Sequence, residues 1–314
     1  MYMKWLDLWI AGKHNLDMSS RDAIEKYHRE KIRATVEYAM QNSRFYSRLY
    51  DSCDTDDFES LPFTTPEDLK AFGEDMVCVK ASDVSRIVTL QTSGTTGKPK
   101  RIYFTAEDQE LTVDYFANGM RFMVNRGDKA LILFPHTSEG SIGLLLKTAL
   151  NRIGVETAFE PQGHVDCVIG APEYVIQLSG VRPDIRADKV LLSSEYVSEN
   201  AREKITQNWG SLIFEHYGMT EMGLGCAVSC GRGAGYHIRE NDIYIEIIDP
   251  KTGKAVSEGQ YGEIVFTTLT RRAMPFIRYR TGDISRWITD DCFCGSVLKR
   301  IDRVKNRREL CHKR

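Results

Sequence analysis

The strongest constraint on the fold is an alternation of short apolar segments with helix-length segments between residues 130 and 215. Apolar runs of strand length are predicted at Ala130–Phe134, Val155–Phe159, Val165–Ile169, Val190–Leu192 and Leu212–Glu215. Helical stretches are predicted between them at Ile142–Arg152 and Glu199–Asn208. Strands that alternate with helices in this way indicate an α/β fold with a mostly parallel sheet and flanking helices.

The segments on either side of this region have a different pattern. Asp22–Met40 places apolar residues at helical spacing, and Thr64–Leu69 (T-T-P-E-D-L) has the cap residue, proline and early acids of a helix N-terminus. After Gly225 the chain becomes rich in β-forming residues, at Ile243–Ile248 and Gly262–Thr268. We therefore expect an α/β core over residues 1–225 and a smaller β subdomain over residues 226–303.

Composition excludes several classes of protein. The 314 residues have a net charge of −2 and no long Lys/Arg run in the middle of the chain, which argues against a nucleic-acid surface. We see no apolar stretch of the roughly 20 residues that cross a membrane, and no signal peptide. Eight cysteines are too few for a disulfide scaffold. The expected location is the cytoplasm, with reduced thiols and no membrane partner.

A glycine- and hydroxyl-rich loop, Gln91–Lys100 (Q-T-S-G-T-T-G-K-P-K), follows a short predicted strand at Ile87–Leu90. Phosphate oxygens need close backbone N–H groups, hydroxyl donors and positive charge. Glycine permits the close approach, Ser and Thr donate hydrogen bonds, and lysine supplies the charge. The residues of these types are Thr92, Ser93, Gly94, Thr95, Thr96, Gly97 and Lys98. The spacing is not that of a P-loop, and the alternative interpretation is a polar turn after the strand.

The loop closely resembles the signature of the acyl-adenylate-forming superfamily, which includes acyl-CoA synthetases, peptide-synthetase adenylation domains and luciferases. Ser193–Ser198 (S-S-E-Y-V-S), Tyr217–Glu221 (Y-G-M-T-E) and Tyr279–Asp283 (Y-R-T-G-D) are similar to three further motifs of that family, in the family's order. Leu61–Leu69 and Pro275–Asp283 resemble phenylacetate-CoA ligase. The similarity extends from about Glu37 to Arg303. It implies the large N-terminal domain of the superfamily, with parallel-rich sheets and a smaller β unit.

The resemblance implies that a carboxylate attacks the α-phosphorus of ATP to give acyl-AMP and pyrophosphate, with catalysis by positioning and charge stabilisation. It assigns the β- and γ-phosphates to Thr92, Ser93, Thr95, Thr96 and Lys98, the α-phosphate to Thr220, and Mg²⁺ to Glu221. Ser194, Glu195 and Tyr217 would contact the adenine, and Asp283 the ribose. Arg303 corresponds to a hinge arginine, but Asp302–Arg303–Val304–Lys305 lacks the hinge acid of the family pattern Gly-Arg-x-Asp.

The sequence says less about the acid. Phe134, His136, Gly140 and Gly143 follow a predicted strand where the family recognises its substrate. His216 immediately precedes Tyr217 and would either orient the carboxylate or be a structural histidine. The nearest relatives imply a small, aromatic carboxylic acid.

Four residues in the C-terminal third have the residue types of a structural zinc site. Cys230 and His237 are followed by Cys292-Phe293-Cys294-Gly295, and three cysteines with one histidine make a closed tetrahedral set. Some phenylacetate-ligase-like proteins resemble this arrangement. Cys226 is a competing ligand for Cys230. The alternative is that these cysteines are small hydrophobes.

Members of the superfamily continue beyond the hinge into a mobile lid, whose lysine contacts the acid and the α-phosphate and which presents the acceptor, often coenzyme A. Residues 304–314 are predicted to be a hinge remnant with no lid after it. Three interpretations stay open: another chain or a homodimer completes the site, the protein is a non-catalytic ATP/AMP-binding accessory or sensor, or the chain is a shortened ligase. A zinc-stabilised interaction module without nucleotide binding is a further alternative.

Overall fold

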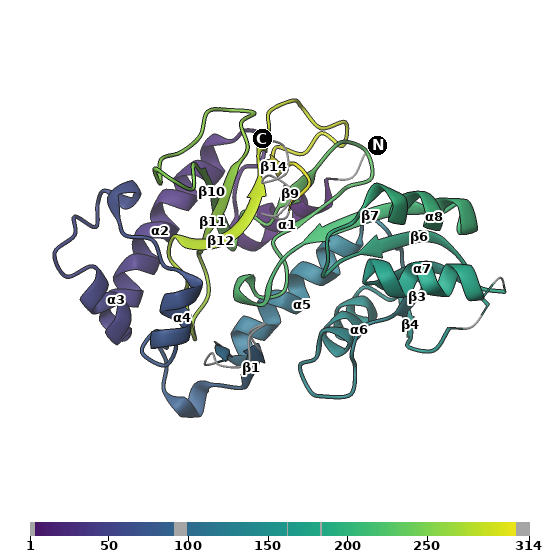
Figure 1. The fold of residues 1–314 in the computed structure, drawn as a ribbon, viewed down its shortest axis with the longest axis horizontal. Coiled ribbons are helices and arrows are strands. Elements are labelled where there is room, and N and C mark those ends of the chain that lie inside the picture. Colours follow the sequence, from purple (N-terminus) through teal and green to yellow (C-terminus); the bar gives the residue numbers. More distant parts are fainter. Residues whose placement is uncertain (1–3, 91–98, 162, 183, 306–314) are drawn as a thin grey trace.

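A computed structural model describes residues 4–90, 99–161, 163–182 and 184–305 of the chain. Within these residues the strands form a nine-stranded sheet, a three-stranded sheet and a two-stranded hairpin. Figure 1 shows the large sheet with its helices at the right and the smaller sheet at the left. The predicted α/β fold is confirmed.

The nine-stranded sheet has a parallel half and an antiparallel half. Its strand order is β13-β14-β9-β8-β7-β6-β5-β3-β4. The strands from β4 to β7 pair in parallel, whereas β8, β9, β14 and β13 pair antiparallel. The parallel strands are β3 (Lys129–Ile132), β4 (Glu156–Ala158), β5 (His164–Gly170), β6 (Arg186–Leu192) and β7 (Leu212–Tyr217). The antiparallel strands are β8 (Ala227–Val228), β9 (Tyr236–Ile238), β13 (Trp287–Ile288) and β14 (Arg300–Ile301).

Helices cover both faces of the parallel half. On one face, α7 (Pro172–Val181) and α8 (Glu199–Trp209) pack Val175 and Ile205 against buried sheet residues such as Val168. On the other face lie α1 (Trp5–His14), α5 (Ala106–Met120) and α6 (Ile142–Arg152). Burying each such aliphatic side chain contributes about 1.5–3 kcal/mol, so both layers hold the sheet in place.

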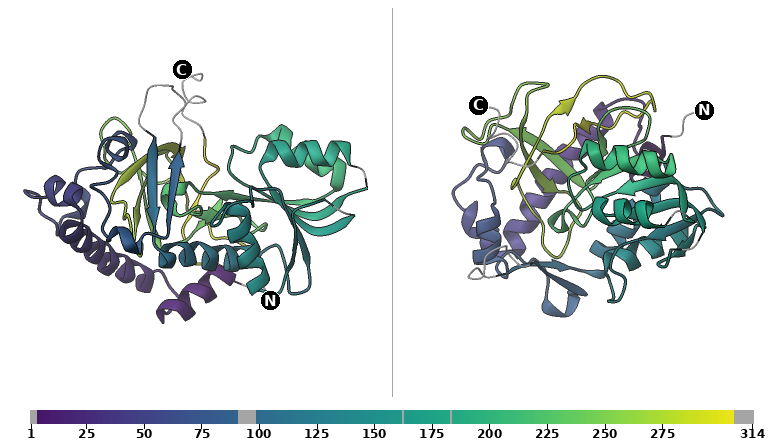
Figure 2. Two further views of the ribbon diagram at one scale, coloured as in Figure 1. Left: turned by 90° about the horizontal axis from the view of Figure 1, so that it is seen from below. Right: turned by 45° about the vertical axis from the view of Figure 1, so that its right-hand side comes forward.

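A second core lies around the three-stranded antiparallel sheet of β10 (Ile243–Ile248), β11 (Gly262–Thr268) and β12 (Tyr279–Ser285). The hairpin of β1 (Arg86–Leu90) and β2 (Lys100–Phe104) packs Ile102 into the same core, and Figure 2 shows this hairpin standing beside the sheet. The remaining elements are α2 (Asp22–Asn42), α3 (Arg44–Leu49), α4 (Pro66–Phe72), η1 (Phe58–Ser60), η2 (Ala81–Asp83) and η3 (Thr220–Met222).

Two helices begin with the same capping box. Thr65 caps α4 and Thr105 caps α5, and each threonine exchanges hydrogen bonds with the aspartate three residues later, Asp68 or Asp108. Such a cap contributes about 1 kcal/mol. The first of these helix starts is the one that T-T-P-E-D-L predicts.

The predicted division of the chain at residue 225 falls inside the large sheet. β7 precedes this residue and β8 follows it, and the two strands pair. Residues 226–303 thus supply strands to both the nine-stranded and the three-stranded sheet. The division into 1–225 and 226–303 stays a prediction. Among the described residues, no helix is long and apolar enough to cross a membrane.

Candidate active site

The predicted adenine and ribose residues lie together around one pocket. Ser194 and Glu195 follow β6, Tyr217 ends β7, and Asp283 lies on β12. The pocket has a volume of about 190 Å³ and is also lined by Tyr196, His216, Gly218, Tyr236, Arg303 and Val304. It opens at the carboxyl ends of two parallel strands, which is where α/β sheets bind their ligands.

Tyr217 and Asp283 form a direct contact at the wall of this pocket. The Tyr217 hydroxyl donates a 2.9 Å hydrogen bond to Oδ2 of Asp283. Burial and the nearby Asp283 charge raise the pKa of Tyr217 well above its usual value, so it stays a hydroxyl donor. Ser194 has a φ of 77°, a left-handed conformation that is costly for a residue with a side chain. The turn after β6 is therefore held in an unusual shape beside the pocket.

Arg303 is anchored at the same wall by carboxylates that the sequence analysis did not identify. It donates a 2.8 Å hydrogen bond to Glu215 and also contacts Glu199. Glu215 is 3% exposed and also accepts hydrogen bonds from Arg202 and, at 2.5 Å, from Tyr236. The family pattern has an acid two residues after the hinge arginine, and this chain lacks it. Glu215 supplies the negative charge beside Arg303 instead. No spacing pattern connects it with that arginine.

Thr220 and Glu221 lie on the short turn η3, which begins two residues after Gly218 of this pocket. The Glu221 side chain is 2% exposed, and its Oε1 lies 2.6 Å from Nζ of Lys100. Lys100 begins β2, so it is the first strand residue after the glycine-rich loop. The loop residues Thr92, Ser93, Gly94, Thr95, Thr96, Gly97 and Lys98 lie outside the described residues. Their assignment to the phosphates stays a prediction.

The donor set at Glu221 fits a magnesium ion. Mg²⁺ prefers oxygen ligands and is usually held by one or two carboxylates together with substrate phosphates. Glu221 presents one buried carboxylate close to Lys100, a residue of the segment predicted to bind phosphate.

An apolar cavity lies on the other side of His216. It has about 30 Å³ of free space between α5, α6 and the sheet, and its wall includes Phe116, Met120, Phe134, Leu146 and His216. His216 lines both the cavity and the nucleotide pocket, and its Nδ1 lies 2.8 Å from the Ser193 hydroxyl. Burial and Arg239 lower the pKa of His216 to about 4, so the ring is neutral at neutral pH.

His136 lies away from this cavity wall, although the sequence placed it near the acid site. Its ring stacks on Phe159 with 3.8 Å between centroids, and its Nδ1 lies 3.2 Å from the Phe134 carbonyl. Of the four residues expected there, Phe134 lines the cavity. Gly143 is required by packing, because a Cβ would lie 2.7 Å from the Pro135 carbonyl.

The Tyr217–Asp283 contact gives a first prediction. We expect Asp283→Asn to weaken AMP binding by about 10-fold, because hydrogen bonds to a charged group contribute about 1.5 kcal/mol or more. Tyr217→Phe should weaken it less, and the double variant should be less impaired than the sum of the two, since both changes break one contact. Calorimetric AMP titration measures this, with the exposed Asp56→Asn as control. Additive effects would show that the contact has no role in binding.

The four predicted zinc ligands converge. Their ligand atoms all lie within 4.8 Å of one another, and all four residues are buried. The Sγ atoms of Cys230 and Cys292 are 3.6 Å apart, and Nε2 of His237 lies 3.4 Å from Sγ of Cys294. Ligands about 2.0–2.3 Å from a central ion in tetrahedral geometry have separations of this size. Cys226, the competing ligand, is buried elsewhere, in the core around the three-stranded sheet.

The electrostatics of this cluster favour metal ligation. A hydrogen bond from Cys294 lowers the pKa of Cys230 well below its usual value, against the effect of burial, while the pKa of Cys294, the donor of that bond, is raised. Hydrogen bonds with His237 and with the backbone N–H of Cys294 also lower the pKa of Cys292, again against burial. Thiolates are the form of cysteine that binds metals. The four residues therefore fit a structural zinc ion in both geometry and chemistry.

Comparisons with known proteins agree on one family. The family model described as AMP-binding enzyme matches residues 22–269. A phenylacetate-coenzyme A ligase from Pseudomonas putida is 28% identical over 93% of this chain and 72% of its own length. One from Aromatoleum evansii is 31% identical over 86% of this chain and 68% of its own length. The structure of 2-hydroxyisobutyryl-CoA ligase with 2-HIB-AMP has a TM-score of 0.82 at 20% identity, covering 95% of this chain and 70% of that one.

Proposed function

Because this chain belongs to the AMP-binding enzyme family, we propose that it activates a small carboxylic acid by forming an acyl-adenylate from ATP. The reaction is that of an acid–CoA ligase of the phenylacetate-CoA ligase type. The observation that best supports it is the placement of Glu221 and Lys100 beside a pocket built from Ser194, Tyr217 and Asp283. Glu221, which is proposed to act at the triphosphate, therefore follows closely after Tyr217, which is proposed to bind the nucleoside.

In this proposal the chain acts by positioning. Asp283 accepts hydrogen bonds from the ribose, while Ser194, Glu195 and Tyr217 contact the adenine. Thr220 binds the α-phosphate, and the loop from Thr92 to Lys98 binds the β- and γ-phosphates. A carboxylate oxygen of the acid bonds to the α-phosphorus, and the bond from that phosphorus to the bridging oxygen breaks, releasing pyrophosphate. The two reactants need only be held in line and their charge stabilised.

Two metal ions have separate roles in the proposal. Glu221 would hold Mg²⁺, which when bound would neutralise phosphate charge. Cys230, His237, Cys292 and Cys294 would hold Zn²⁺ in a structural role, since four protein ligands leave no open position. Coenzyme A as the acceptor, a cytoplasmic location, and a homodimer or partner chain that completes the site stay predictions.

The cavity beside His216 supports a compact, apolar acid. Its wall is built from aromatic and aliphatic side chains, and its free space is small. The free space of about 30 Å³ is smaller than an aromatic ring, so an aryl or arylacetic acid needs the wall side chains to move, and a long fatty chain needs a larger opening still. In this proposal the neutral ring of His216, which lines both the cavity and the pocket of Tyr217 and Asp283, faces the carboxylate where it meets ATP.

Isotope exchange between ATP and pyrophosphate, run with a panel of acids, tests the function directly. We expect exchange with at least one aryl or arylacetic acid and less with long-chain fatty acids. Exchange needs only the adenylation step, so it does not depend on thioester formation. ATP binding by calorimetry without exchange for any acid would contradict the enzymatic proposal and favour the accessory or sensor alternative.

A further inference from the structure

A buried arginine links the strand after the phosphate loop to the turn that carries Glu221. Arg271 is 7% exposed and follows β11. Its Nη1 donates a 2.7 Å hydrogen bond to the Glu221 carbonyl, and its Nη2 donates a 3.1 Å hydrogen bond to the Tyr103 carbonyl on β2. One planar guanidinium therefore bridges both segments, which are far apart in the sequence.

The position of this guanidinium is itself fixed. Its Cζ lies 4.3 Å from the Phe104 ring centroid and 5.5 Å from that of Phe276. Asp108 accepts hydrogen bonds from the backbone N–H groups of Arg272 and Ala273, which ties the adjacent backbone to the start of α5. Burial lowers the pKa of Arg271 to about 10, so the group remains charged at neutral pH. A buried charge is costly unless it is hydrogen-bonded or paired, and the two carbonyls supply hydrogen bonds to this one.

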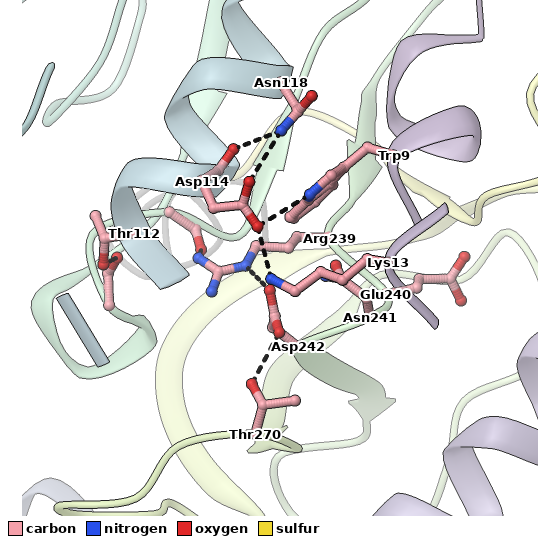
Figure 3. A network of polar contacts seen from close by, with 12 residues as sticks. Trp9, Lys13, Thr112, Asp114, Asn118, Arg239, Glu240, Asn241, Asp242 and Thr270 are labelled. Atoms are coloured by element: carbon pink, nitrogen blue, oxygen red, sulfur yellow. Dashed lines mark hydrogen bonds and ion pairs between the residues drawn. The ribbon is translucent and has the colours of Figure 1, made fainter. Parts of the chain in front are cut away.

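The same turn is held at two further backbone carbonyls. Thr112 on α5 donates a 2.9 Å hydrogen bond to the Gly223 carbonyl, and Arg239 reaches the Gly225 carbonyl at 3.5 Å. Figure 3 shows Arg239 held in turn by Asp242, at 2.7 Å, and Asp242 by Thr270, the neighbour of Arg271. The figure also shows Lys13 and Trp9 of α1 contacting Asp114 on α5. Side chains from separate elements thus hold the turn behind Glu221.

We propose that Arg271 is a positioning residue that fixes the Glu221 turn against β2, the strand that carries Lys100, and so controls binding of magnesium and the ATP β- and γ-phosphates. The inference rests on the proposed function in one respect, the role of Glu221 as the Mg²⁺ ligand. Arg271 acts through the Glu221 backbone, whereas Lys100 contacts the Glu221 carboxylate itself. Residues that orient a metal ligand commonly affect metal affinity or activity by about 10- to 100-fold.

The test compares two nucleotides on the full chain. Arg271→Met keeps apolar packing against Phe104 and removes both hydrogen bonds, whereas Arg271→Lys keeps the charge but lacks the planar fork that binds two carbonyls. We expect Arg271→Met to weaken Mg²⁺–ATP binding by about 10- to 100-fold and to raise the Mg²⁺ concentration required, with a smaller loss for Arg271→Lys. AMP affinity should stay close to that of the unchanged chain, because AMP lacks the β- and γ-phosphates.

Arg272→Met is the matched control. Arg272 is the neighbour of Arg271 in the sequence, it is exposed, and its Cζ lies 4.4 Å from the Tyr38 ring centroid. It should leave both affinities unchanged. Equal losses of AMP and Mg²⁺–ATP affinity in Arg271→Met would show a general structural role and overturn the proposal, as would unchanged Mg²⁺–ATP affinity. Failure of the unchanged chain to catalyse exchange would count against the enzymatic function alone, since the binding comparison needs no turnover. If the unchanged chain binds neither nucleotide, both proposals are wrong.

Discussion

Glu221→Gln is expected to reduce ATP–pyrophosphate exchange by about 100- to 1,000-fold, because charge stabilisation through a bound metal ion is worth several kcal/mol. Glutamine keeps the size of the side chain but loses the negative charge that pairs with Lys100 at 2.6 Å and is proposed to hold Mg²⁺. The defect should appear in Mg²⁺–ATP binding as well as in the exchange rate. AMP binding should change little, since Glu221 does not line the nucleoside pocket.

The control for this variant is Glu203→Gln, an exposed glutamate on α8 with the same change in charge. Removing one partner of a buried ion pair also lowers stability, so thermal unfolding and AMP affinity must be measured on each variant. Exchange at a rate close to that of the unchanged chain would show that Glu221 is not the magnesium ligand. Loss of AMP binding together with exchange would instead point to a folding defect.

Much of the fold was predictable because local pattern and tertiary packing agree in the parallel half of the large sheet and in the three-stranded sheet. The predicted helix Ile142–Arg152 is α6 with the same bounds, and the predicted strand Ile243–Ile248 is β10. Strand ends differ by a few residues; Ala130–Phe134, for example, is β3 at Lys129–Ile132. Apolar periodicity identifies such segments because it reflects which face is buried.

Other elements gave weaker local signals. α5 was not predicted, although Thr105 and Asp108 form the same capping box that the structure shows at α4. Its apolar residues face α1, α6 and the sheet, so several sides are buried and the helical stripe is less distinct. The antiparallel half of the large sheet was also missed, because β8, β13 and β14 have two residues each, too few for any periodic pattern.

The candidate site also contains residues that the sequence identifies and residues that it does not. Residues within short motifs, such as Tyr217 and Asp283, could be named in advance, and the fold places them around one pocket. Arg271, Glu215 and Thr112 act through backbone carbonyls or partners many positions away, and such pairings are set by tertiary structure. Sequence reasoning from a single chain has no signal for them.

The second large effect is expected from loss of the zinc site, because the strands at this edge of the sheet are short. β8, β9, β13 and β14 form only a few ladder hydrogen bonds, so pairing alone holds this edge weakly. The cluster of Cys230, His237, Cys292 and Cys294 joins the segment after β8, strand β9 and the loop between β13 and β14. We expect Cys230→Ser to lose the metal and to lower the free energy of unfolding by several kcal/mol, since structural zinc contributes directly to folding.

This effect should reach the nucleotide pocket, because β14 leads directly to Arg303, which lines that pocket. Elemental analysis, thermal unfolding with and without a chelator, and AMP titration on chain purified without chelators measure the three consequences together.

Cys226→Ala is the matched control: its thiol is fully buried and near Cys230 in sequence but lies outside the cluster. It should retain the metal and its chelator sensitivity. Equal metal content in both variants, or unfolding of the unchanged chain that ignores a chelator, would contradict a structural zinc ion. Loss of stability in Cys230→Ser with unchanged AMP affinity would show that the edge strands fold independently of the Arg303 wall.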